Sequence, residues 1–255
     1  MFILLVAWPL SIYGQGATAP PSGKKGKPIR LAADLNWRFG VHGIEFFQQY
    51  KRLVGGPSST FDIPLGLWAS LGSYQFENVV IGVTGGYNRA VVRENYVYRP
   101  FGQDTVRRVT QGLSQNMALT TIPVMLSLDY LPIDRQFATY VGAALGVSAT
   151  SFVWTETAAA SQDVRSRSSG TRFDDSRITP SAMVRVGVLL GWDKDVRTRT
   201  SAGFYLEVSY LWAPFTAPVL ASLQQSVPGV TQTDGVTTLQ AGGLGIHAGV
   251  NITLR

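Results

Sequence analysis

Six charged residues lie on the polar side of segments in which apolar and polar side chains alternate. They are Arg30, Asp34, Arg38, Asp129, Arg185 and Glu207. Reflecting the sixth such segment onto the seventh about the turn at 193–200 sets Arg185 nearly opposite Glu207. We predict an ion pair between these two side chains and a wider network across the enclosed space. Its simplest role is mutual neutralisation of buried charges, and its alternative role is a gate or a cation-selective constriction.

The two histidines, His42 and His247, are the candidate acid–base catalysts. If the two end segments pair, these residues lie about five positions apart, on the order of 17 Å at ~3.4 Å per residue. They therefore cannot share a metal ion or a proton relay. Ser148 and Asp129 share the polar face, but no spacing sets a nucleophile within ~3 Å of a base. We expect packing roles for both histidines and no catalytic site.

The sequence contains few residues or motifs that could bind a cofactor or a metal ion. Cysteine is absent, which removes disulfides, thiolate nucleophiles and cysteine metal sites together. No phosphate-binding glycine loop, EF-hand pattern or zinc signature is present. The sequence therefore predicts neither a cofactor nor a bound metal.

Aromatic and basic residues are interleaved in the segment 93–114, which we expect to be a loop. The residues concerned are Arg93, Tyr96, Tyr98, Arg99, Arg107 and Arg108. Such a mixture could bind lipopolysaccharide phosphates or an acidic protein partner. The segment 157–178 balances arginine against aspartate, which is typical of a solvated loop.

The elements that must position these residues are eight segments of strict alternation. They lie at 29–41, 63–73, 79–92, 117–131, 137–148, 184–192, 204–212 and 243–254. In the last segment Leu244, Ile246 and Val250 share one face, and His247 and Asn251 share the other. The connections run alternately long and short, as in an up-and-down barrel of outer-membrane type. We predict an all-β fold, an eight-stranded antiparallel up-and-down transmembrane β-barrel, or ten strands if 41–62 contains a hairpin.

Aromatic residues near the segment ends decide which face would meet lipid. They include Trp37, Tyr87, Tyr130, Phe137, Trp192, Phe204 and Trp212. Rings at both ends of an apolar band form the girdle of a membrane barrel, whereas a soluble lipocalin-like barrel turns its apolar face inward. We expect lipid outside and a polar lumen too narrow for a large channel. A short amphipathic helix around Phe46, Phe47 and Tyr50 is expected at the barrel rim.

The N-terminal region divides into two parts before the barrel. An apolar run with small residues following it predicts a signal peptide at 1–14. A Pro-, Gly- and Lys-rich stretch predicts a flexible periplasmic linker at 15–28, and the barrel domain follows at 29–255. The net charge is +6, and Lys24, Lys25, Lys27 and Arg30 supply four of the positive charges. The high pI therefore gives no support to nucleic-acid binding.

Three segments resemble the small outer-membrane β-barrel proteins of Bacteroidetes, often called PorT-like. They are IPVMLSLDYLP (Ile122 to Pro132), YVGAALGVS (Tyr140 to Ser148) and GLGIHAGVNITLR (Gly243 to Arg255). The resemblance implies a barrel of the cell envelope and suggests a link to protein secretion. The functions of that group are heterogeneous, so the resemblance specifies architecture and not an activity.

Taken together, these patterns predict a monomer in the outer membrane of a Gram-negative bacterium, with periplasmic termini and extracellular long loops. We expect a non-catalytic protein with a structural or interaction role. The expected partners are outer-membrane lipid, lipopolysaccharide and an envelope or secretion protein. Two alternatives stay open: a narrow pore or transporter for small solutes, and an envelope enzyme that modifies lipids or peptides.

Overall fold

The computed structural model of this protein describes most of the chain outside the N-terminal region. The described residues are 27–40, 44–54, 61–62, 65–76, 78–98, 111–131, 137–160, 168–190, 201–221 and 236–254. The predicted signal peptide and nearly all of the predicted linker therefore lie outside the described residues. So do the candidate catalyst His42 and the girdle residue Trp192.

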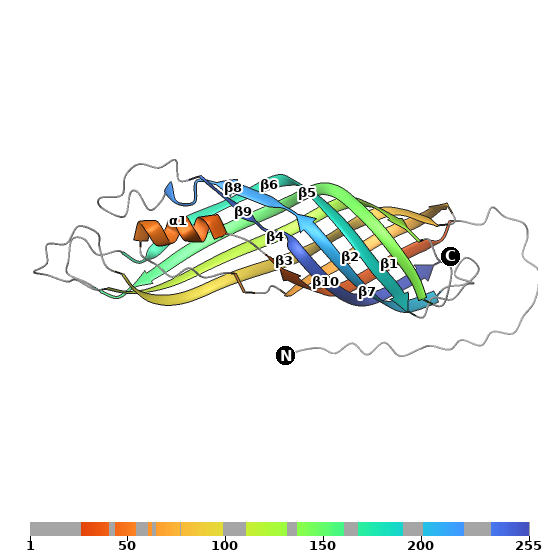
Figure 1. Cartoon of the computed structure of the whole chain (residues 1–255), viewed down its shortest axis with the longest axis horizontal. Coiled ribbons are helices and arrows are strands. Elements are labelled where there is room, and N and C mark those ends of the chain that lie inside the picture. Colours follow the sequence, from red (N-terminus) through yellow and green to blue (C-terminus); the bar gives the residue numbers. More distant parts are fainter. Residues whose placement is uncertain are drawn as a thin grey trace, which may run out of the picture.

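Eight antiparallel strands close into a barrel (Figure 1). They are β1 (Ile29–Phe39), β2 (Leu65–Phe76), β3 (Val79–Tyr98), β4 (Gln111–Tyr130), β5 (Phe137–Ala158), β6 (Gly170–Leu190), β7 (Ser201–Trp212) and β10 (Gly243–Leu254). Neighbours in the chain are neighbours in the wall, and β1 closes the ring against β10 with Ile29 opposite Leu254. The predicted fold class is confirmed.

Three further elements lie in the connections between barrel strands. The first long connection contains a helix, α1 (Ile44–Val54), where a hairpin was the alternative, so it adds no strand to the wall. The connection after β7 contains a two-stranded sheet that we did not expect, β8 (Pro214–Ala217) paired with β9 (Thr237–Gln240). α1 and the β8–β9 sheet lie at the end of the barrel away from Leu254 (Figure 1).

The two segments expected to be loops at 93–114 and 157–178 are strand at both of their ends, and there the expectation is wrong; 99–110 and 161–167 lie outside the described residues. β3 continues to Tyr98, β4 begins at Gln111, β5 reaches Ala158 and β6 begins at Gly170. Their inner faces meet protein and their outer faces are mostly polar, with Val97 and Ile178 as exposed exceptions. This part of each strand therefore lacks the continuous apolar outer face that marks a lipid-facing strand. β3, β4, β5 and β6 thus form a long extension on one side of the barrel (Figure 1).

A core of aromatic rings fills the inner side of this extension. We call it the aromatic plug; its members are Phe46, Phe47, Tyr50, Phe61, Phe152, Trp154 and Phe215, all buried. Phe46 of α1 packs edge-on against Phe152 at 5.8 Å between ring centres, and Tyr50 against Trp154 at 5.2 Å. α1 and the β8–β9 sheet contribute to one core with β4 and β5 at that end of the barrel.

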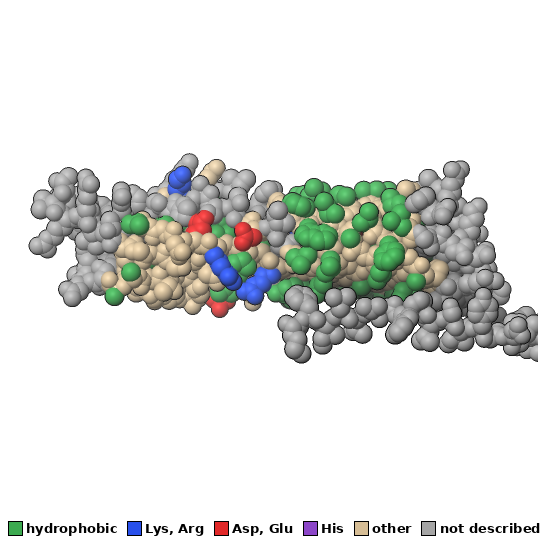
Figure 2. All heavy atoms as spheres, turned by 90° about the horizontal axis from the view of Figure 1, so that it is seen from below, with side chains coloured by type: hydrophobic (Ala, Val, Ile, Leu, Met, Phe, Trp, Pro, Cys, Tyr) green, Lys and Arg blue, Asp and Glu red, His purple; other side chains and the backbone are tan. Residues whose placement is uncertain are grey.

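The opposite half of the barrel carries an apolar outer surface, which we call the belt (Figure 2). Its exposed side chains include Leu35, Leu67, Val83, Leu126 and Val186. Eleven residues of β1 at ~3.3 Å each, tilted by ~40°, give a belt about 28 Å tall, close to the ~25 Å apolar band of membrane barrels. Within the described residues, no helix is long and apolar enough to span a membrane.

Candidate functional site

The lumen at the height of the belt is filled by charged and polar side chains. Asp129 of β4 lies at the centre of one group, which we call the Asp129 cluster: Arg30, Asp129, Tyr140, Arg185 and Glu207. Arg185 donates to Asp129 through Nε at 2.8 Å and through Nη2 at 2.9 Å. Arg30 Nη1 lies 3.4 Å from the second carboxylate oxygen. One buried carboxylate therefore holds two arginines.

Glu207 of β7 provides the second negative charge of the Asp129 cluster. Its carboxylate accepts a hydrogen bond from Tyr140 at 2.7 Å and lies 3.8 Å from Arg185 Nε. The structure contains the predicted ion pair between Arg185 and Glu207, although the two residues are diagonal neighbours, because Ser209 pairs with Arg185 and Gly187 with Glu207. The β6–β7 register differs by one residue from simple reflection about the turn at 193–200, which would set Arg185 opposite Val208. Two arginines and two carboxylates balance in the cluster.

A second group, the His247 cluster, lies beside the first and consists of Asp34, Tyr205, Ser209 and His247. His247 Nδ1 lies 2.8 Å from Asp34 Oδ1, and His247 Nε2 lies 2.8 Å from Ser209 Oγ. Tyr205 donates its hydroxyl to the other oxygen of Asp34. The expectation that no nucleophile lies within reach of a base is therefore wrong. Pairing β7 with β10 makes Ser209 and His247 diagonal neighbours, because Ser209 pairs with Gly245 and Glu207 with His247.

Serine, histidine and aspartate in this order resemble the hydrogen-bonded series of a serine hydrolase. Acyl transfer also needs room for a substrate carbonyl next to the serine oxygen. Ser209 is 2% exposed and His247 1% exposed. The cavity that touches both clusters holds about 10 Å³, which is room for a single water molecule. The described structure offers hydrogen bonding between these side chains but no substrate site.

A fluorophosphonate probe gives a direct check of this conclusion. We expect no adduct on Ser209 when the folded protein is incubated with the probe in detergent, since the serine oxygen has no space to form a bond to phosphorus. Intact-protein mass spectrometry measures the adduct, and a Ser209→Ala variant is the control. An adduct that forms on the folded protein and is lost in Ser209→Ala would show that the site is reactive.

Arg38 is the member of the predicted charge network that stands apart from both clusters. It is fully buried, its Nη1 donates to the Gly243 carbonyl at 3.1 Å, and its guanidinium lies 5.3 Å from the centre of the Trp68 ring. No described carboxylate lies within 4 Å of it. Arg38 is held by a cation–π contact and one hydrogen bond and does not join the predicted charge network through a described ion pair.

Glycines on the lumen face make room for large rings. A Cβ at Gly187 would lie 2.6 Å from the Tyr140 ring, and one at Gly86 would lie 2.5 Å from the Trp68 ring. The rings of Tyr140 and Trp68 therefore occupy the space that the missing side chains of Gly187 and Gly86 leave in the lumen.

The predicted girdle residues take the following positions. Trp37, Tyr87, Tyr130, Phe204 and Trp212 face outward with exposed fractions of 41–67%, and Phe137 is the first residue of β5. Sequence analysis missed Phe76 at the end of β2, which is 72% exposed. Alternation alone could not find it, because the β2–β3 register shifts there.

The predicted loop-binding residues divide into three groups. Arg93 is exposed on the outer face of β3. Tyr96 is partly buried against the plug, where its hydroxyl lies 2.5 Å from that of Tyr50. Tyr98 is the last residue of β3, and Arg99, Arg107 and Arg108 lie outside the described residues.

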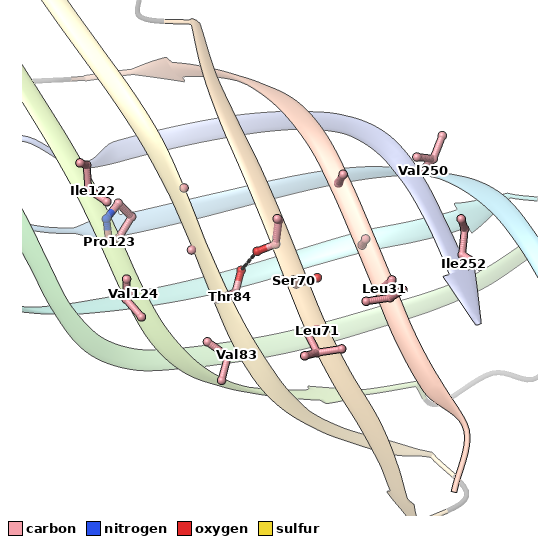
Figure 3. A pocket seen from close by; sticks show the side chains of 15 residues that line it. Leu31, Ser70, Leu71, Val83, Thr84, Ile122, Pro123, Val124, Val250 and Ile252 are labelled. Atoms are coloured by element: carbon pink, nitrogen blue, oxygen red, sulfur yellow. Dashed lines mark hydrogen bonds between the residues drawn. The ribbon is translucent and has the colours of Figure 1, made fainter. Parts of the chain in front are cut away.

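An apolar groove of about 630 Å³ crosses the belt (Figure 3). Its floor is a row of small residues paired across three strands, Ala33, Ala69 and Gly85. Leu31, Leu71, Val83 and Val124 are among the side chains around it (Figure 3). Pro123 has no N–H, and the β3–β4 ladder is interrupted opposite it. The groove offers hydrocarbon contact, and no described cluster of His, Asp or Glu is suited to a metal ion.

Comparison with known proteins identifies the architecture. No protein-family profile and no curated protein sequence matches the chain. Among solved structures, the outer membrane protein OprG from Pseudomonas aeruginosa is similar over 91% of this chain and 98% of its own, with 13% identity and a TM-score of 0.50. This chain has the fold of the small outer-membrane β-barrels.

Two further solved structures are similar at lower scores. Ail, the attachment invasion locus protein of Yersinia pestis, covers 90% of this chain and all of its own, with 10% identity and a TM-score of 0.40. Neisserial surface protein A covers 91% of this chain and 97% of its own, with 10% identity and a TM-score of 0.37. At these identities the likeness describes the fold of the barrel alone.

Proposed function

We propose that this protein is an integral outer-membrane barrel with a closed lumen, which holds the β3–β6 extension and its aromatic plug at the cell surface. Its role is structural or in binding an envelope partner, without catalysis. The single observation that carries this proposal is the filling of the lumen by the Asp129 and His247 clusters. Among the described residues, the cavity between the two clusters holds about 10 Å³, which is too small for a solute or a substrate.

The outer-membrane location is supported by the belt, whose height suits a bilayer, and by outward-facing rings at both of its ends. β1 begins and β10 ends at the same end of the barrel, as an even strand number requires. We place that end in the periplasm and α1 outside the cell. The PorT-like resemblance of three segments supports a bacteroidetal envelope protein connected with secretion, and we offer that connection as part of the proposal.

Single-cysteine labelling tests the location and orientation. The native chain has no cysteine, so each introduced thiol is the only one. Lys51 of α1 is exposed at one end and Lys27 at the other. In intact cells we expect a membrane-impermeant maleimide to label Lys51→Cys and to leave Lys27→Cys unlabelled until the outer membrane is permeabilised. The reverse pattern would overturn the orientation, and labelling of both in intact cells would overturn the membrane location.

Planar-bilayer recording tests the closed lumen. We expect no discrete openings from the wild-type protein, because ion pairs and rings fill the barrel at two levels. Removing two rings with Tyr140→Ala and Tyr205→Ala is expected to produce openings, since both side chains contact the buried carboxylates. Steady unitary currents from the wild-type protein would favour the narrow pore instead.

A further inference from the structure

Two arginines on the outer face of β3 have no ionic partner in the described part of the chain. Arg89 and Arg93 are both exposed, while the residues between and beside them on the inner face, Asn88, Ala90 and Val92, are buried. No described carboxylate lies within 4 Å of either guanidinium. Their neighbours across the ladder, Thr120 and Asn116, are uncharged. Both charges are therefore directed away from the protein.

These arginines lie directly beyond the edge of the belt. The uninterrupted apolar run on the outer face of β3 ends at Tyr87, which is 42% exposed, and Arg89 is the next outward residue. Basic side chains lie directly beside the belt in Figure 2. Four residues at ~3.3 Å each put the backbone of Arg93 about 13 Å beyond that of Arg89. Headgroups of the leaflet that covers the belt would occupy this height.

We propose that Arg89 and Arg93 bind the phosphate groups of lipid A, the membrane anchor of lipopolysaccharide. Lipid A has acyl chains that fit the belt and a phosphate at each end of its sugar pair. A guanidinium forms charge-assisted hydrogen bonds with phosphate oxygens, which makes arginine the suitable residue at such a site. The proposal rests on the orientation given above, in which this end of the belt meets the outer leaflet.

The carboxylates near this pair do not neutralise it. Glu94 follows Arg93 but lies on the inner face, where Gln115 Nε2 donates to it at 3.4 Å. Asp62 lies closer, because its N–H donates to the carbonyl of Val91, between the two arginines. Its side chain is exposed and makes no described ion pair. One carboxylate beside two arginines leaves a net positive charge, and removing Asp62 should strengthen phosphate binding.

The test uses the full-length protein in a non-ionic detergent and bisphosphorylated lipid A as the probe, with bound lipid counted by native mass spectrometry. We expect Arg89→Gln or Arg93→Gln to weaken binding about fivefold each, and the double variant about thirtyfold. Asp62→Asn should bind at least as well as the wild type. Lys27→Gln removes an exposed charge at the opposite end and should leave binding unchanged.

Dephosphorylated lipid A and phosphatidylglycerol distinguish the phosphate site from other sources of binding. Wild-type protein that binds dephosphorylated lipid A equally well would overturn the proposal, since acyl chains would then be sufficient. Equal preference for phosphatidylglycerol would also overturn it, in favour of general attraction to anionic lipid. The cysteine-labelling experiment reports orientation independently, so a failure of lipid A binding and a failure of the proposed orientation give different results.

Discussion

Replacing Asp129 with asparagine is expected to lower the free energy of unfolding by about 3–5 kcal/mol. The carboxylate accepts two hydrogen bonds from Arg185 and lies 3.4 Å from Arg30, all in the buried lumen. Glu207 alone then faces two buried arginines, so one positive charge loses its compensation. Urea-induced unfolding in lipid vesicles, followed by electrophoretic mobility without boiling, measures the change.

Two further variants show whether charge is the cause. Adding Arg185→Gln to Asp129→Asn leaves one positive charge, on Arg30, and one negative charge, on Glu207. Because these two charges balance, the double variant should be more stable than Asp129→Asn alone. Asp175→Asn removes an exposed carboxylate paired with Arg177 at 2.8 Å, and should cost less than about 1 kcal/mol. If Asp129→Asn costs no more than Asp175→Asn, the Asp129 cluster does not stabilise the barrel.

Trp154→Ala is expected to release α1 from the barrel while leaving the barrel itself closed. Trp154 is fully buried and contacts Phe46 and Tyr50 of the helix. Truncating a buried tryptophan costs about 3–5 kcal/mol, which exceeds what a short helix can recover by its own propensity. Limited trypsin digestion should then cut after Lys51, an exposed residue of α1, much faster than in the wild type.

The control for this experiment is an equally large truncation elsewhere. Trp37→Ala removes an exposed ring of the belt and should not change cleavage after Lys51. The heat-induced mobility shift in SDS should persist in Trp154→Ala, because the β1–β10 and β6–β7 ladders do not involve this residue. Unchanged digestion of Trp154→Ala would mean that α1 is held by other contacts than the plug.

The barrel was predictable because lipid on one side and a polar lumen on the other impose a two-residue period. β10 begins and ends where the alternation does, from Gly243 to Leu254. The period is weaker where a strand leaves the belt. There Leu113 and Met117 on the inner face of β4 pack against the plug, while the outer face of this part of β4 is polar. The sequence of this part of the strand therefore resembles that of a loop. The β8–β9 sheet was missed because each of its strands has only four residues.

The sequence predicts which charged residues face the lumen, but it does not predict all of the side chains that they contact there. Facing the lumen follows from alternation, and Arg30, Asp129, Arg185 and Glu207 all do so. Which carboxylate meets which arginine depends on the register between strands. Glu207 lies 3.8 Å from Arg185 as a diagonal neighbour, whereas Asp129 makes the shorter contact at 2.8 Å. Partners on strands that are distant in the chain cannot be read from the period at all. Asp34 and His247 are brought together only by the closing of β1 against β10.

That closing ladder determines when the protein can fold. Ile29 pairs with Leu254, so almost the whole chain must be available before the last hydrogen bonds form. Contacts so distant in sequence form slowly, because the entropy of closing the loop is lost before the contact is gained. Until then β1 and β10 both present unpaired edges, which favour pairing with other chains. A chain of this design therefore depends on being kept apart from its copies until its final strand arrives.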